Sequence, residues 1–270
     1  MASKKRKKKL VEVLLWILVM AVLGVIGVSG VYIYNIYQEK QEFRERGIQA
    51  YEAGNYKEAI EDMQISLSIN GPFVAPLDRD SRLYLADSLF LAGRYVEAID
   101  QYNKLLLSEE SQIDYLILQK TVSQGMVDYN NQNYEDALPA FRRAVEAGHL
   151  ECALYAGVCA GETGLQEDMI EYFLEYLEYD PNSAYCYDRL ADYYFTGGDY
   201  ETAKQYIDFG LACEDHSCDA QLRWLLLSYY EYQRDYNTAY ELILDYISDF
   251  GTDNLVRKEY DFLVTRQTID

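Results

Sequence analysis

The chain begins with a long apolar run that contains no charged residue. Residues 13–34 read VLLWILVMAVLGVIGVSGVYIY, and a helix of this length would cross a hydrocarbon core of roughly 30 Å. Aromatic residues lie near both ends of the run, as they do in membrane helices: Trp16 on one side, and Tyr32, Tyr34 and Tyr37 on the other. The pattern predicts a transmembrane helix over 13–37.

The flanking charges predict the orientation of this helix. Residues 4–9 are all basic, and the positive-inside rule then keeps the tail 1–12 in the cytoplasm and places the rest of the chain outside it. A cleaved signal peptide is the competing interpretation, because residues 28–30 read VSG, a small-residue cleavage site. The apolar run is longer than the usual signal-peptide core, which favours an uncleaved signal-anchor.

The segment after the apolar run contains neither proline nor glycine until Gly47. Both residue types interrupt helices, so their absence favours an unbroken helix. We therefore expect the membrane helix to continue into the body of the protein and to hold that body close to the bilayer.

A short pattern of polar residues, tyrosine and alanine then recurs along the chain. It reads YEAGNYKEAI at 51–60, and a weaker copy, TGLQEDMIEY, occupies 163–172. A spacing near 34 residues is typical of repeated helical pairs, and the Gly, Asn or Asp before the tyrosine predicts the turn within each pair. The tyrosine positions, with Gln166 in the weak copy, lie 32 to 39 residues apart and are Tyr56, Tyr95, Tyr134, Gln166, Tyr200 and Tyr236.

Three further positions of each copy have a consistent size. The position nine residues before the tyrosine and the position three after it are mostly small, while the position seven after it is large and apolar. Small residues let two antiparallel helices approach, and the large residue fills the space between them. The three sets are Gly47, Ala86, Gly125, Gly157, Ala191 and Leu227; Ala59, Ala98, Ala137, Met169, Ala203 and Ala239; and Met63, Tyr102, Phe141, Phe173, Ile207 and Ile243.

These copies resemble the tetratricopeptide repeat family over about residues 40–250. The resemblance implies an all-α fold: a single transmembrane helix followed by a right-handed α-solenoid of about six helical hairpins and a C-terminal capping helix. The sequence departs from the family pattern in having the usual proline after only one second helix, at Pro181, and an insertion at 69–80. The expected repeat domain is 38–270, with repeats at about 40–71, 79–110, 118–149, 150–182, 184–215 and 220–251, and the capping helix at 253–267.

Composition narrows the possible functions. Half of the residues are hydrophobic, which argues against a disordered chain. The net charge is −21, and residues 1–12 contribute about +5, so the remainder carries about −26. The part of the chain after residue 12 is acidic enough to repel the phosphate backbones of nucleic acids, which disfavours nucleic-acid binding.

The sequence contains no catalytic motif, and we predict a non-enzymatic protein without cofactor or metal. Of the two histidines, His149 is interpreted as part of a helix cap. Cys213, His216 and Cys218 are too few for a zinc site. Outside the cytoplasm, a disulfide between Cys213 and Cys218 would be plausible. Cys152 and Cys159 are interpreted as small core residues.

In the tetratricopeptide family, the first helix of each pair lines a concave groove. An aromatic and acidic groove suits a peptide with basic and apolar residues, and the near absence of cations disfavours the acidic tails that some family members bind. The alternative is that many of these aromatics pack between helices. The resemblance places on or near the groove Arg44, Tyr51, Asp87, Phe90, Tyr129, Tyr185, Asp192, Phe195, Trp224, Glu231 and Tyr232.

The preferred interpretation is a single-pass plasma-membrane scaffold that binds a protein or peptide outside the cytoplasm. A second interpretation is an accessory subunit of a cell-envelope enzyme or secretion complex. A carbohydrate-binding receptor that uses the tyrosines is a third, less favoured one, because the sequence offers no cluster of polar residues suited to it.

Overall fold

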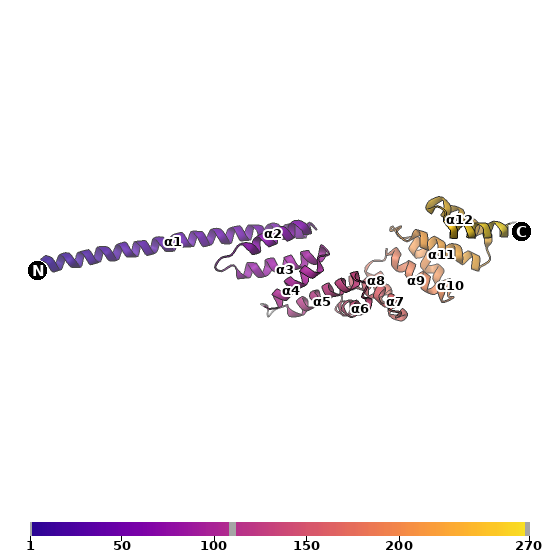
Figure 1. Ribbon diagram of the computed structural model, residues 1–270, viewed down its shortest axis with the longest axis horizontal. Helices are drawn as coiled ribbons and strands as arrows, with labels where there is room; N and C mark the ends of the chain where they lie inside the picture. The colour runs from indigo at the N-terminus through magenta and orange to yellow at the C-terminus, as the bar shows by residue number, and fades with distance from the viewer. Residues whose placement is uncertain (1, 108–111, 268–270) are drawn as a thin grey trace. The chain divides into compact units, whose positions relative to one another are not determined.

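The computed structural model describes residues 2–107 and 112–267, and every regular element in these ranges is a helix (Figure 1). The end of the predicted second repeat, 108–110, and residues 268–270 of the predicted repeat domain lie outside them. The helices are α1 (Ala2–Glu52), α2 (Tyr56–Ser68), α3 (Ala75–Leu91), α4 (Tyr95–Leu106), α5 (Ile113–Asn130), α6 (Tyr134–Glu146), the 3₁₀ turn η1 (Leu150–Cys152), α7 (Ala153–Glu162), α8 (Gln166–Tyr179), α9 (Ala184–Thr196), α10 (Tyr200–Leu211), α11 (Asp219–Tyr232), α12 (Tyr236–Phe250) and α13 (Asn254–Gln267).

The helices form two compact units, Met1–Val127 and Asp128–Asp270, which we call the N-terminal and C-terminal units. The division falls within α5. Consecutive helices pack against each other from α1 to α4 and from α6 to α13, as α1 does on α2 and α9 on α10. This all-helical arrangement of neighbouring pairs confirms the predicted fold class.

Helix α1 is unbroken from Ala2 to Glu52, which confirms that the apolar run continues into the body. Its described part, Leu14–Glu52, contains a window of mean hydropathy 2.6, none of which is buried in the protein. A core helix of a soluble domain would be mostly buried, so that interpretation is excluded. By length and composition, α1 is a candidate for either a membrane anchor or a signal sequence.

A buried lysine joins the C-terminal part of α1 to α2, to the loop after it and to α3. Lys40 has no exposed side-chain surface, and its Nζ donates hydrogen bonds to the carbonyl oxygens of Ser66 at 2.6 Å and Ile69 at 3.0 Å. The same ammonium group forms an ion pair with Asp78 of α3. A buried charge is tolerated only when it is paired and hydrogen-bonded in this way.

All six turns within the helical pairs have the same backbone geometry. The residue two before each tyrosine-type position has a positive φ, at Gly54 (75°), Gly93 (74°), Gln132 (61°), Gly164 (79°), Gly198 (83°) and Arg234 (61°). The next N–H then bonds to the carbonyl five residues earlier, as Asn55 does to Ala50 at 2.8 Å. This is the Schellman helix ending, and it confirms the predicted turns.

The second helix of every pair begins at the tyrosine-type position. The eighteen size-restricted positions of the six copies are all buried. Close approaches join the first set to the third: a Cβ placed on Gly47 would lie 2.9 Å from Cε of Met63, and one placed on Gly157 would lie 2.6 Å from the Phe173 ring. Small residues on the first helix therefore make room for large ones on the second.

Two first helices start earlier than the repeat boundaries predicted from the sequence. Helix α3 begins at Ala75 rather than near 79, because Pro76 stands in its first turn, where a missing N–H costs nothing. Helix α5 begins at Ile113 rather than near 118. The predicted insertion at 69–80 is thus a loop of six residues followed by helix.

The capping helix is present as α13, which packs on α12. Its Val256 and Leu263 are buried with Leu227 and Ile243. The large apolar position of the last copy is therefore covered from solvent, as the end of a helical repeat array requires.

Candidate functional site

Four of the predicted groove aromatics pack within their own helical pair. Each precedes the tyrosine-type position by five residues and contacts its ring across the turn. Such tilted or edge-on contacts stabilise the hairpin, so these side chains have a structural role. The ring pairs are Tyr51–Tyr56 (centroids 6.0 Å apart), Phe90–Tyr95 (5.4 Å), Tyr129–Tyr134 (5.7 Å) and Phe195–Tyr200 (5.1 Å).

The remaining two predicted groove tyrosines have more exposed rings. Tyr185 of α9 lies edge-on to Phe173 and is 37% exposed. Tyr232, at the end of α11, stacks on Tyr200 at 3.6 Å and is 56% exposed. Both rings keep exposed surface, which leaves them able to pack against a ligand.

Asp87 of α3 is held by neighbouring tyrosines. The hydroxyls of Tyr102 and Tyr115 donate to it at 2.7 Å and 3.2 Å. Burial raises the pKa of the Asp87 carboxyl, and these two hydrogen bonds oppose the rise. Its acceptor oxygens are thus used inside the N-terminal unit, and the structure favours a packing role over ligand binding.

Arg44 of α1 is likewise paired, with Asp80 of α3. It lines a cavity of about 400 Å³ in the N-terminal unit, together with Leu83, Leu105 and Leu116. The Arg44 guanidinium is therefore already matched by a carboxylate, and Arg79 lines the same cavity.

Two further predicted residues, Asp192 and Trp224, line one cavity of about 450 Å³ in the C-terminal unit. We call it the α9–α11–α13 pocket. The indole of Trp224 packs edge-on to Tyr246 at 5.5 Å, and this aromatic wall lines the same cavity as three carboxylates. The lining residues are Asp188, Arg189 and Asp192 from α9; Ala220, Gln221, Trp224 and Leu225 from α11; Tyr246 from α12; and Asp253, Leu255 and Val256 at the start of α13.

The pocket carries three carboxylates and one guanidinium. Burial raises the pKa of the Asp188 carboxyl to about 6, with Asp192 adding to the rise and Arg189 opposing it. When all groups are charged, the lining has a net charge of −2 (three Asp, one Arg). An aromatic wall beside negative charge is the arrangement that attracts a cation.

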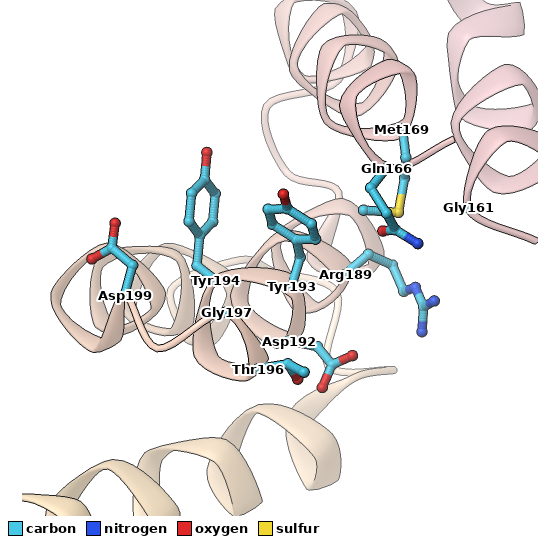
Figure 2. A pocket seen from close by; sticks show the side chains of 10 residues that line it. All are labelled: Gly161, Gln166, Met169, Arg189, Asp192, Tyr193, Tyr194, Thr196, Gly197 and Asp199. Atoms are coloured by element: carbon cyan, nitrogen blue, oxygen red, sulfur yellow. The ribbon is translucent and has the colours of Figure 1, made fainter. Parts of the chain in front are cut away.

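A second cavity, of about 570 Å³, is also lined by Arg189 and Asp192 (Figure 2). Figure 2 shows the Tyr193 and Tyr194 rings projecting together from one side of α9, with Asp192 and Thr196 pointing away from them. The shared residues make the two cavities parts of one surface along α9.

The family-based groove prediction missed several residues of the pocket. Asp188 lies four residues before Asp192 on the same helix face, a spacing that was readable in the sequence. Tyr246 and Asp253 were missed because they come from α12 and the start of α13, whereas the prediction considered only the first helices.

Glu231 belongs to the contact between α11 and α13. Burial raises the pKa of the Glu231 carboxyl, and the neighbouring Glu259 adds to the rise. Glu231 does not line the α9–α11–α13 pocket.

All five cysteines are buried free thiols. Cys152 and Cys159 are in the core as predicted, while Cys213 and Cys218 lie in one hydrophobic cluster with Leu222. No bond joins the last two in the structure, and the disulfide remains a prediction. Within the described ranges, no group of three or more His, Cys, Asp or Glu is arranged to hold a metal ion.

Comparison with known proteins agrees with this architecture. Residues 44–112 and 122–184 match the family model of the tetratricopeptide repeat. No curated protein sequence matches the chain.

Solved structures resemble the fold at low sequence identity. PilF of Pseudomonas aeruginosa is 18% identical, with 86% of this chain and 99% of that chain covered and a TM-score of 0.57. MamA of Desulfovibrio magneticus RS-1 is 17% identical, with 65% and 95% covered and a TM-score of 0.48. At these identities the likeness concerns the fold alone.

Proposed function

We propose that this chain, a tetratricopeptide repeat protein, is a non-catalytic scaffold that α1 anchors in the plasma membrane. Its repeats bind a basic and apolar peptide segment outside the cytoplasm. Repeats of this family form extended surfaces that bind proteins, and the chain is a protein-interaction scaffold in that sense. We further propose that α1 is a membrane anchor, that the repeats lie outside the cytoplasm, and that the ligand is basic and apolar.

The lining of the α9–α11–α13 pocket is the reason for proposing a basic and apolar ligand. Its three carboxylates exceed its one guanidinium, and Trp224 offers an aromatic wall. A lysine or arginine side chain entering this pocket would gain both ion pairing and a cation–π contact. The apolar neighbours Leu225 and Val256 suit an aliphatic side chain next to that cation.

The Trp224→Ala variant is expected to bind a basic peptide about tenfold more weakly, because it loses the aromatic wall of the pocket. The measurement is fluorescence anisotropy of the full chain in detergent with a labelled peptide of alternating arginine and leucine. The Asp192→Asn variant should also weaken binding, by about three- to tenfold.

The matched controls are Tyr179→Ala, at an aromatic 58% exposed on α8, and Glu171→Gln, at an exposed acid of the same helix. Neither side chain lines the pocket, so both variants should bind like the parent chain. A peptide with glutamate in place of arginine should not bind. Equal binding of the two peptides would contradict the proposed ligand chemistry.

Binding of the arginine–leucine peptide should weaken as the pH falls from 8 through about 6. The raised pKa of Asp188 means that this carboxylate gains a proton in that range and the pocket loses a negative charge. A bound cation favours the ionised form, so the midpoint should lie at or below 6. A titration of anisotropy against pH checks this. In the Asp188→Asn variant, this pH dependence should disappear; binding that strengthens on acidification would exclude the role of Asp188.

The orientation is testable with an introduced thiol. All five native cysteines are buried, so they are unsuitable reporters, whereas Val96 at the start of α4 is 69% exposed. We expect a membrane-impermeant maleimide to label the Val96→Cys variant in intact cells and to label Ser3→Cys, in the basic tail, only after lysis. The opposite result would place the repeats in the cytoplasm.

A further inference from the structure

The loop between α2 and α3, residues 69–74, lies against the part of α1 that follows its apolar run. A Cβ placed on Gly71 would be 2.8 Å from Cγ2 of Ile36, so loop and helix are in direct contact. The carbonyl of Ile69 also accepts a hydrogen bond from Lys40 at 3.0 Å. Figure 1 shows the loop projecting from the α2–α3 pair along α1 toward its N-terminal end.

The position of this contact along α1 places the loop near the end of the apolar run. Ile36 lies two residues beyond Tyr34, and two residues of helix correspond to about 3 Å. If α1 spans a bilayer, the loop therefore lies at the depth where headgroups meet acyl chains, beside the aromatic residues of α1.

The loop presents apolar side chains to solvent. Phe73 is 82% exposed and has a φ of 65°, a conformation that is uncommon for an aromatic residue. Pro72, Ala75 and Pro76 beside it are also exposed. The backbone thus holds a large apolar ring away from the core, where it gains nothing from burial within the protein.

The charge pattern singles out the same segment. Residues 63–77 contain no charged side chain, although the whole chain has a net charge of −21. An acidic protein is repelled by anionic lipid headgroups, so an uncharged segment is the part of it that can approach a bilayer at least cost.

We infer that the 69–76 segment is a second membrane contact, in which Phe73 enters the headgroup–acyl boundary of the leaflet from which α1 emerges. The inference rests on the proposed anchoring by α1. Apolar and aromatic side chains bind at this boundary, and the loop continues the apolar surface of α1 there. Together with the Lys40 contacts, a second contact would restrict rotation of the N-terminal unit about the α1 axis.

The test uses tryptophan fluorescence in the full chain. The chain has two tryptophans, Trp16 and Trp224; both are changed to phenylalanine, and Phe73→Trp is added. The protein is reconstituted into phosphatidylcholine vesicles with or without brominated acyl chains. The control is Val96→Trp in the same background, since Val96 is 69% exposed and lies just after the far end of the 17-residue α3.

We expect brominated lipid to quench the emission of the Phe73→Trp variant by more than about twofold and to leave the Val96→Trp variant unaffected. Emission in vesicles without bromine should also be shifted to shorter wavelength for Phe73→Trp only. A short-wavelength emission without quenching would mean that protein, not lipid, covers the loop, and would overturn the inference.

Two other results would separate this inference from the proposed anchor. If the chain floats with the vesicles but bromine quenches neither variant, or quenches both equally, the loop contact is wrong and the anchor stands. If the chain does not float with the vesicles, the anchor and the loop contact both fail.

Discussion

Replacing Lys40 with methionine is expected to lower the free energy of unfolding of the N-terminal unit by about 3 kcal/mol. The change removes the donor to the Ser66 and Ile69 carbonyls and the partner of Asp78. Asp78 is 35% exposed and regains some hydration, which keeps the loss at the lower end of the range for broken buried pairs. Urea unfolding of the full chain in detergent, followed by circular dichroism, measures it.

The matched control is Lys104→Met, because Lys104 forms an exposed pair with Asp100 four residues earlier on α4. Exposed pairs of this kind contribute about 0.5 kcal/mol or less. Adding Asp78→Leu to Lys40→Met should restore part of the stability, since it removes the unpaired carboxylate. Equal effects of the Lys40 and Lys104 changes would show that the buried lysine adds no stability.

The Gly157→Ala variant is expected to lose about 2 kcal/mol of stability in the C-terminal unit. Alanine is favoured over glycine in a helix by about 1 kcal/mol, but the new Cβ would lie 2.6 Å from the ring of Phe173. Phe173 is 1% exposed and has nowhere to move, so overpacking outweighs the propensity gain. Thermal unfolding followed by circular dichroism checks the loss.

Gly161→Ala is the control on the same helix, since its Cβ would meet the flexible Met169 side chain at 3.0 Å. Methionine adapts its shape readily, so this change should alter the melting temperature little. Combining Gly157→Ala with Phe173→Leu should recover much of the loss. If Gly157→Ala proves as stable as the parent, the close approach of α7 and α8 is wrong.

The sequence was a good guide wherever the same local requirement recurs in each copy. The six second helices begin at the tyrosine-type positions, and Met63, Phe141 and their counterparts are buried. A turn with a positive φ and an alternation of small and large residues leave a pattern that repetition makes readable. Gln132 and Arg234 adopt the same turn without glycine, and the same backbone hydrogen bond closes it, from Asn133 to Asp128 and from Asp235 to Tyr230.

The candidate site was less predictable. The sequence identified Asp192 and Trp224, but it grouped them with Tyr51, Phe90 and others whose rings pack on their own hairpins. Exposure of an aromatic ring depends on which helix packs over it. For Tyr51 and Phe90, the covering ring comes from the tyrosine-type residue five positions later, a local pairing that the family-based groove prediction did not consider.

The sequence alone therefore determined the apolar helix, the repeated hairpins with their turns and small and large positions, and the acidic character of the body. Only the tertiary structure decided that Lys40 is buried, that Asp87 is held by tyrosines, and that Asp253 joins Asp192 in one pocket. The physical reason is range. Helix periodicity and turn chemistry act over a few residues, whereas Lys40 contacts partners 26 to 38 positions away. No local sequence pattern shows which buried polar group will have such a distant partner.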